Sequence, residues 1–150
     1  MTEGIYQLNL SHHIKYITNR VPYNRTEDAC GMVAVDKNSR MVGAVIFDNF
    51  LHSSAQITLV ISSPKAIKLG LLECAVDFLF TTCKKQYAFA FVAQANEKSL
   101  RLCKRVGFRY QMAIPKGYSE DCDLLLFRLD KDEVNLRTRK EQRVLNYVQA

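Results

Sequence analysis

One apolar segment followed by an amphipathic one constrains this chain more than any other feature. Residues 86–94 are rich in alanine and aromatic residues, as in a buried strand. Residues 96–106 have helical apolar spacing, and Asn96 can cap them through its side-chain oxygen. Gly107 suits the left-handed position after a last helical turn. The segment therefore predicts a strand that leads directly into a helix ending on glycine.

The length of 150 residues and the 48% hydrophobic content are those of one domain with a full core. No run of about 18 apolar residues is present, so the sequence predicts no membrane-spanning helix. The first residues lack a basic-then-apolar leader pattern, which favours a cytoplasmic protein. The five cysteines are widely spaced in apolar surroundings, which predicts reduced thiols rather than disulfides or a metal site.

The net charge of +6 leaves several kinds of partner open. A basic surface attracts phosphate groups, nucleic acid or an acidic protein, and it also simply favours solubility. Nucleic acid is the weakest of these expectations, because the basic residues are scattered and no base-reading motif is present.

Apolar periodicity and turn signals predict a mixed α/β fold with a predominantly antiparallel sheet and helices on both faces. Strand, helix and strand over 54–94 form a crossover unit, so its two strands should be parallel. The predicted strands are 4–10, 31–36, 41–50, 54–62, 86–94, 108–114 and 122–129. The predicted helices are 12–20 with Ser11 as cap, 64–83 with Ser63 as cap, 96–106 and 131–147. A loop is predicted over 115–121.

The motif Asn-x-x-Ser-x-x-Leu-x-x-x-x-Gly-Phe at 96–108, together with this element order, resembles the GNAT N-acetyltransferases over about residues 4–130. The resemblance implies that the strands at 54–62 and 86–94 splay apart around the pantetheine arm of acetyl-CoA. It also implies that the pyrophosphate rests at the next helix start, at 63–68, where backbone N–H groups favour anions. The implied cofactor-binding residues are Leu59, Val60, Ile61, Ser63, Lys65, Ala66, Lys68, Asn96 and Ser99.

The phosphate loop departs from the family pattern, which is Gln/Arg-x-x-Gly-x-Gly/Ala. Here residues 63–68 read Ser-Pro-Lys-Ala-Ile-Lys, so none of the three marked positions keeps its usual residue. Pro64 also removes one possible N–H donor. Two interpretations stay open: an altered phosphate site in which Lys65, Lys68, Ser62 and Ser63 replace the glycines, or an ordinary helix start with solvated lysines.

Acetyl transfer needs a base for the amine and benefits from an acid for the leaving thiolate. Many GNAT enzymes have a tyrosine seven residues after the asparagine, and that position is Cys103 here. Its thiol is either the acid or a small packed hydrophobe. Tyr110 and Tyr118 are further acid candidates or packed aromatics. His52 is the candidate base or a plain loop histidine.

Several carboxylates are candidates for binding a cationic substrate near the predicted cleft, or are simply solvated. They are Asp48, Glu120, Asp121 and Asp123.

Residues 131–150 extend beyond the predicted domain at 1–130. Basic residues outnumber acidic ones there, and the apolar stripe is thin. This pattern predicts a helix that docks on its own domain, on a second copy or on a larger assembly, or one that stays solvated.

Two main functions follow from the resemblance. The first is an acetyl-CoA-dependent N-acetyltransferase acting on an amine. The second is a non-catalytic GNAT-fold interaction or structural protein, because the chain resembles small GNAT-like proteins of tailed bacteriophages with similarly altered loops. The resemblance to these bacteriophage proteins implies that the protein is a virion component.

Overall fold

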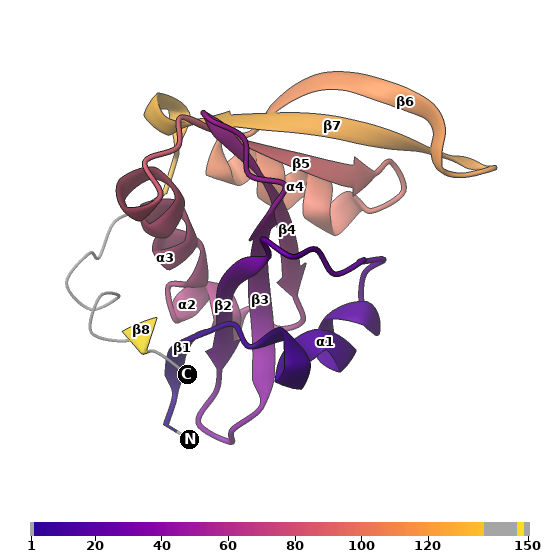
Figure 1. The fold of residues 1–150 in the computed structure, drawn as a ribbon. Coiled ribbons are helices and arrows are strands. Elements are labelled where there is room, and N and C mark those ends of the chain that lie inside the picture. The colour runs from indigo at the N-terminus through magenta and orange to yellow at the C-terminus, as the bar shows by residue number, and fades with distance from the viewer. Residues whose placement is uncertain (1, 137–146, 149–150) are drawn as a thin grey trace.

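One mixed sheet organises the chain in this computed structural model, which describes residues 2–136 and 147–148. The strand order is β6-β7-β5-β4-β3-β2-β1-β8 (Figure 1). The β4–β5 and β1–β8 pairs are parallel, and the other neighbouring strands are antiparallel. The strands are β1 (Gly4–Gln7), β2 (Cys30–Val35), β3 (Met41–Asp48), β4 (Ser54–Ile61), β5 (Tyr87–Ala93), β6 (Arg109–Ser119), β7 (Cys122–Asp130) and β8 (Tyr147–Val148).

Helices cover both faces of the sheet, as the sequence predicts. Alternate residues of the central strands point to opposite faces, which gives two apolar clusters. Val33 and Ile46 pack with Ile17 of α1 (Leu10–Thr18) on one face. Met32 and Val45 face α3 (Leu71–Asp77) and α4 (Glu97–Val106) on the other. No helix in the described part of the chain is long and apolar enough to cross a membrane.

The long helix predicted over 64–83 is wrong as a single element. It divides into α2 (Lys65–Lys68), α3 and a π-helical turn, η1 (Phe78–Thr82). Gly70 separates the first two because it adopts a left-handed conformation with φ of 90°. That conformation suits glycine and interrupts an α-helix.

The N-terminal boundaries also differ from the prediction. The first strand ends at Gln7 rather than continuing to residue 10. The first helix begins at Leu10 with Asn9 at the N-cap position, so Ser11 is inside the helix and is not its cap. The Asn9 backbone N–H donates instead to Nδ1 of His13, 3.0 Å away. A side chain one turn along therefore partners this N–H.

The last two strands form a longer hairpin than predicted. β6 continues to Ser119, which pairs with Cys122, so the loop predicted over 115–121 is reduced to a tight turn. The pairing is irregular between Ile114 and Ser119. Within that irregularity, the Lys116 N–H donates to the Asp123 carboxylate at 3.0 Å. This bond holds the bulged strand against its partner.

The strand–helix unit predicted over residues 86–107 is confirmed. β5 leads into α4, and the Asn96 side chain accepts a hydrogen bond from the Ser99 N–H at 3.2 Å. Gly107 ends the helix in the left-handed region with φ of 113°. Both cap residues therefore act as their chemistry predicts.

The described part of the C-terminal extension contacts the domain. Residues 131–133 form a short 3-10 turn, and the Asn135 N–H donates to the Val106 carbonyl at 2.7 Å. Tyr147 and Val148 pair with β1 as a strand, so the helix predicted over 131–147 is wrong at both ends. The rest of that predicted helix, residues 137–146, lies outside the described residues.

We expect Gly107→Ala to destabilise the fold by about 2 kcal/mol or more, because an L-residue is strained in the left-handed region. The added Cβ would also lie 2.2 Å from the Glu133 carbonyl oxygen. Urea unfolding would measure the difference in the free energy of unfolding.

Lys104→Ala on the exposed side of the same helix is the matched control. It should stay within about 0.5 kcal/mol of the unmodified protein. A Gly107 variant as stable as this control would contradict the packing between the end of α4 and residues 133–135.

Candidate active site

The β4 and β5 strands separate partway along their length. Only three residue pairs join them, of which Gln56 with Phe89 is the last. Beyond that pair, β4 stays bonded to β3 as far as Ile61, and β5 stays bonded to β7 as far as Ala93. The two strands therefore diverge (Figure 1), which confirms the splayed parallel pair that the sequence predicts.

The diverging half of β4 contains three of the predicted cofactor-binding residues. Val60 is buried against the α1 cluster, whereas Leu59 and Ile61 are half-buried against the α3 cluster. Because the pairing with β5 stops at Gln56, the edge of this segment that faces β5 is free of that strand. The segment thus offers a strand edge to a ligand.

The backbone N–H groups at the helix start after β4 already have hydrogen-bond partners within the chain. Those of Ser62 and Ser63 donate to the Val42 carbonyl, and that of Lys65 donates to the Ser63 hydroxyl. The N–H groups of residues 66–68 donate to the carbonyls of Ser63 and Pro64. Pro64 has none to offer. Anion binding here would therefore rely on side chains rather than on a ring of free backbone donors.

Two lysines supply positive charge at this helix start. Lys65 is half-buried, and its Nζ lies 3.4 Å from the Glu3 carboxylate. Lys68 is exposed on the last turn of α2. The Ser62 hydroxyl pairs with Tyr16 of α1 at 2.5 Å, which ties α1 to the loop. Lys68 is thus the better placed of the two cations for an added anion.

The start of α4 lies at the same open end, after β5. Asn96 is exposed, and its side-chain oxygen is engaged in the cap bond to Ser99. Glu97 occupies the first turn, where a carboxylate suits the helix dipole. Both sides of the opening therefore carry an acidic residue beside a basic one, because Glu97 lies 3.9 Å from Arg101 and Glu3 lies beside Lys65.

Cys103 lies in the core beneath α4 and is only 1% exposed. Burial raises the pKa of its thiol to about 11. An acid with that pKa would donate to an ordinary thiolate, whose pKa is about 8.5, only against a considerable free-energy difference. The structure thus favours the packing role among the two that the sequence leaves open.

The other two catalytic candidates lie on different elements. Tyr110 of β6 is 57% exposed and packs edge-on against Phe127 of β7, with ring centroids 5.9 Å apart. His52 is exposed just before β4, and its carbonyl accepts a hydrogen bond from Lys85. In the described part of the chain, no hydrogen bond or ring contact joins Cys103, Tyr110 and His52 to one another.

A buried carboxylate lies beside the point of divergence. Asp48 ends β3 directly opposite Gln56 and is only 3% exposed. Burial raises the pKa of its carboxyl group, and the nearby Asp28 carboxylate raises it further. The Thr26 hydroxyl donates toward Asp48 at 3.3 Å. The Tyr23 hydroxyl is near enough for the two groups to affect each other's pKa.

Sequence reasoning missed most of this cluster. The sequence offers Asp48 as one of several carboxylates for a cationic substrate, but the segment 23–30 has no motif or periodicity. Only the fold brings Tyr23, Thr26 and Asp28 over Asp48.

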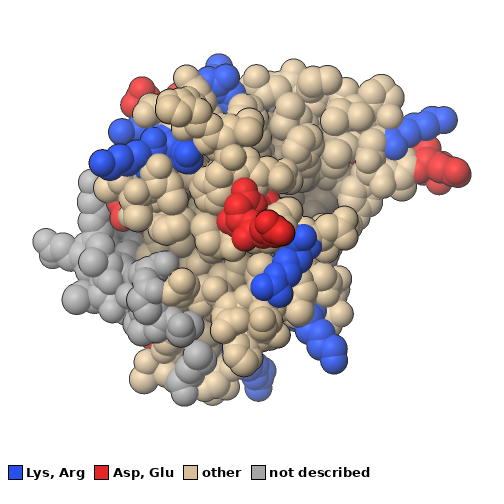
Figure 2. Space-filling model, viewed as in Figure 1, with Lys and Arg blue, Asp and Glu red and all other residues tan. Residues whose placement is uncertain are grey.

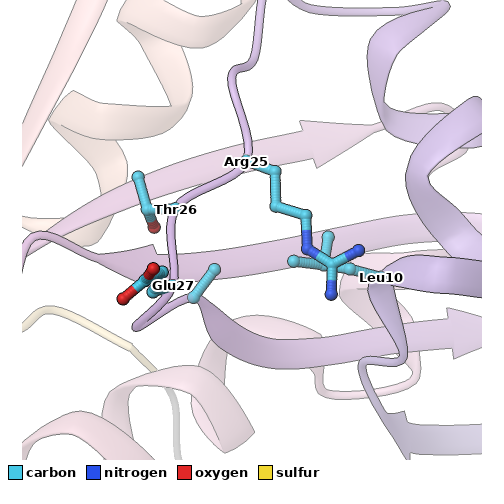
Figure 3. Close-up of a pocket in the computed structure, with 5 residues that line it drawn as sticks. Leu10, Arg25, Thr26 and Glu27 are labelled. Carbon is cyan, nitrogen blue, oxygen red and sulfur yellow. The ribbon is translucent and has the colours of Figure 1, made fainter.

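The segment over Asp48 also borders an open pocket of about 460 Å³. The residues that line it are Leu10, Arg25, Thr26, Glu27 and Ala29 (Figure 3). Thr26 thus connects the pocket to the buried carboxylate. Among the described residues, no three His, Cys, Asp or Glu side chains are grouped as a metal ion would require.

The comparison with protein families identifies the fold. Residues 2–109 match the family described as acetyltransferase (GNAT) domain. The chain belongs to the GNAT acetyltransferase family. The match includes the strands β1–β5 and α4, which together form the opening, and it ends at the start of β6. No curated protein matches the sequence.

Solved structures share the GNAT architecture at low sequence identity. Spermidine/spermine N-acetyltransferase SpeG from Vibrio cholerae, in complex with manganese ions, is 16% identical with a TM-score of 0.69, over 87% of this chain and 94% of that chain. A dodecameric spermidine N-acetyltransferase from Vibrio cholerae is 18% identical with a TM-score of 0.66, over 87% and 95%. At this identity the likeness supports the fold.

We expect Asp48→Asn to raise the melting temperature at neutral pH, because it removes a buried charge and keeps the shape. The raised pKa means that the folded protein prefers the protonated carboxyl group. Protonation of Asp48 therefore stabilises the folded protein in acid, and this contribution to stability is lost as pH rises through the folded-state pKa.

Thermal unfolding across pH would check the sign of this effect. The variant and the unmodified protein should differ most near pH 7 and converge in acid, where Asp48 is neutral. A variant that is less stable near pH 7 would contradict an uncompensated carboxylate.

Proposed function

We propose that this GNAT protein transfers an acetyl group from acetyl-CoA to an amine. The β4–β5 opening carries the proposal, because β5 stops covering the edge of β4 after Gln56. An extended arm with amide groups can bond to such an edge as an added strand does. The SpeG structures are named as spermidine or spermine N-acetyltransferases and share the fold, which supports an amine acceptor.

In this proposal the pantetheine arm lies along Leu59, Val60 and Ile61. The pyrophosphate is near Lys65 and Lys68, with Ser63 and Ala66 beneath it. Asn96 and Ser99 border the arm from the start of α4. Since the N–H groups of 62–68 have partners within the chain, the lysine charges contribute most of the phosphate affinity.

The chemistry is direct transfer. The neutral amine nitrogen attacks the thioester carbonyl carbon, a C–N bond forms and the C–S bond breaks. The nitrogen loses one proton and the departing thiolate gains one. Tyr110 and His52 stay predictions for the acid and the base, and the raised pKa of Cys103 disfavours it as the acid.

A non-catalytic interaction or structural role, as in a virion component, is the second candidate. One observation favours it: the backbone donors at the helix start are already engaged, and Pro64 lacks one. A cytoplasmic location stays a prediction. So does self-association, because most of the C-terminal segment predicted to mediate it lies outside the described residues.

We expect the double variant Lys65→Glu, Lys68→Glu to bind acetyl-CoA more weakly by about 1–3 kcal/mol, the scale of lost charge-assisted contacts. Calorimetric titration would measure the affinity. Thiol release with a panel of amines would then test transfer itself.

The matched control is Lys84→Glu, Lys131→Glu, which makes the same charge change at the paired end of β4 and β5. It should leave the affinity near that of the unmodified protein. Equal affinity in both double variants would reject this phosphate placement. Absence of acetyl-CoA binding in the unmodified protein would favour the second candidate.

We expect Cys103→Ala to retain the fold and to lower the rate of acetyl transfer by less than about tenfold, because a packing residue is not needed for proton transfer. Loss of a general acid would typically lower that rate by about 100-fold or more. Single-turnover kinetics with saturating acetyl-CoA would separate the two cases. A hundredfold loss with normal acetyl-CoA binding would show that Cys103 is the acid.

A further inference from the structure

A hydrogen bond between two hydroxyl groups ties α1 to the end of β4. The Tyr16 hydroxyl oxygen lies 2.5 Å from that of Ser62. Ser62 directly follows Ile61, the last residue of the β4 segment that β5 leaves uncovered. Tyr16 is half-buried against the α1 cluster, whereas Ser62 is exposed. α1 therefore borders the open end of the β4–β5 opening, beside the helix start that contains Lys65 and Lys68.

The Arg20 side chain lies on the Tyr16 ring. Its guanidinium carbon is 4.0 Å from the ring centroid, and its Nη1 donates to the Tyr16 carbonyl at 3.0 Å. A guanidinium over an aromatic ring is held by a cation–π interaction, which keeps the charge in place without neutralising it. The positive charge of Arg20 therefore lies within one aromatic ring of the hydroxyl that contacts Ser62.

Arg20 keeps donors for an added ligand. It is exposed, and no ion pair joins it to an acidic side chain in the described part of the chain. Within residues 2–136, the bond to the Tyr16 carbonyl is the one hydrogen bond that its side chain makes, although a guanidinium carries several N–H groups in a planar fork. Lys65, by contrast, is paired with Glu3. Arg20 is thus freer than Lys65 to bind an anion.

The surface around Arg20 is basic. Between Glu3 and Glu27 the sequence contains Lys15, Arg20 and Arg25 but no acidic residue. Figure 2 shows Lys and Arg side chains projecting from the part of the surface where Figure 1 places α1. An anion at the end of β4 therefore meets positive side chains from the α1 side as well as from the α2 lysines.

We propose that Arg20 binds a phosphate group of acetyl-CoA at the open end of the β4–β5 opening and that the Tyr16 ring positions it. This inference rests on the proposed transfer function and adds α1 to the co-substrate site. The guanidinium fork donates to two phosphate oxygens at once, which a lysine ammonium does less well. Because the backbone N–H groups after β4 are engaged within the chain, Arg20 joins the lysines as a side-chain donor in their place.

The experiment measures acetyl-CoA affinity by calorimetric titration at low ionic strength. Arg20→Gln should weaken binding by about tenfold or more, as expected for a lost charge-assisted hydrogen bond. Arg105→Gln is the matched control and should bind normally, because it removes the same charge from the exposed last turn of α4, at the end that contacts residue 135. The difference between the two variants should shrink as salt is added, because salt screens exposed charges.

Tyr16→Leu tests the positioning role of the ring. It should weaken acetyl-CoA binding in the unmodified protein but have no further effect in Arg20→Gln, because the ring acts through the guanidinium. Equal weakening in both backgrounds would show that Tyr16 acts on the fold instead, and would overturn its positioning role.

The same titrations with acetyl-dephospho-CoA separate two sources of the phosphate. If the loss in Arg20→Gln persists with this ligand, Arg20 contacts the pyrophosphate, and if it disappears, Arg20 contacts the ribose phosphate. Equal acetyl-CoA affinity in Arg20→Gln and the unmodified protein would overturn the inference and leave the transfer function standing. So would an equal loss in Arg105→Gln, because the effect would then follow net charge. Absence of acetyl-CoA binding in the unmodified protein would reject the transfer function and the Arg20 site together.

Discussion

The end of the β4–β5 pairing after Gln56 and Phe89 is the constraint on which the rest of the molecule depends. Each strand keeps its outer neighbour, so the sheet divides into a β4-side half and a β5-side half that are joined at one end. At the joined end, Ala55 pairs with Ala88, and both are buried in the cluster beneath α3 and α4. That shared core holds the halves together while their other ends diverge.

The divergence gives the opening two borders, each with its own charged side chains. Lys65 and Lys68 follow β4, whereas Asn96 and Glu97 follow β5. In the proposed function a phosphate group at the β4 border relies on these lysines, because the chain uses the backbone donors there internally. Asp48, by contrast, lies at the joined end on the α1 face.

Local chemistry made most of the fold predictable. Asn96 and Gly107 specify α4 through caps that depend only on neighbouring residues, and the crossover rule fixes the parallel pair. The errors arose at one residue with an exceptional backbone conformation and at one contact between strands. Gly70 breaks a helix whose apolar pattern is continuous, and the β6 strand continues past Ile114 because Asp123 of the partner strand binds its bulge.

The strands and helices that form the candidate site were predictable from the sequence, but the positions of its polar groups were much less so. The resemblance to the GNAT family predicted these strands and helices, because the order of the elements and the α4 motif can be read from the sequence. Tyr23 and Thr26 meet Asp48 only in the folded chain, so no spacing rule connects them.

In β3, one buried residue does not match the apolar character of its neighbours. Its residues from Val42 to Phe47 are apolar or glycine and are buried, as expected of a central strand. Asp48 continues the same buried strand with a charge, and no cation among the described residues balances it. An apolar residue there would be consistent with its neighbours, and exceptions of this kind concentrate at functional sites. The buried charge therefore lowers the stability of the strand that it ends, and the hydrogen bonds that Asp48 receives from Thr26 and Tyr23 offset part of that cost.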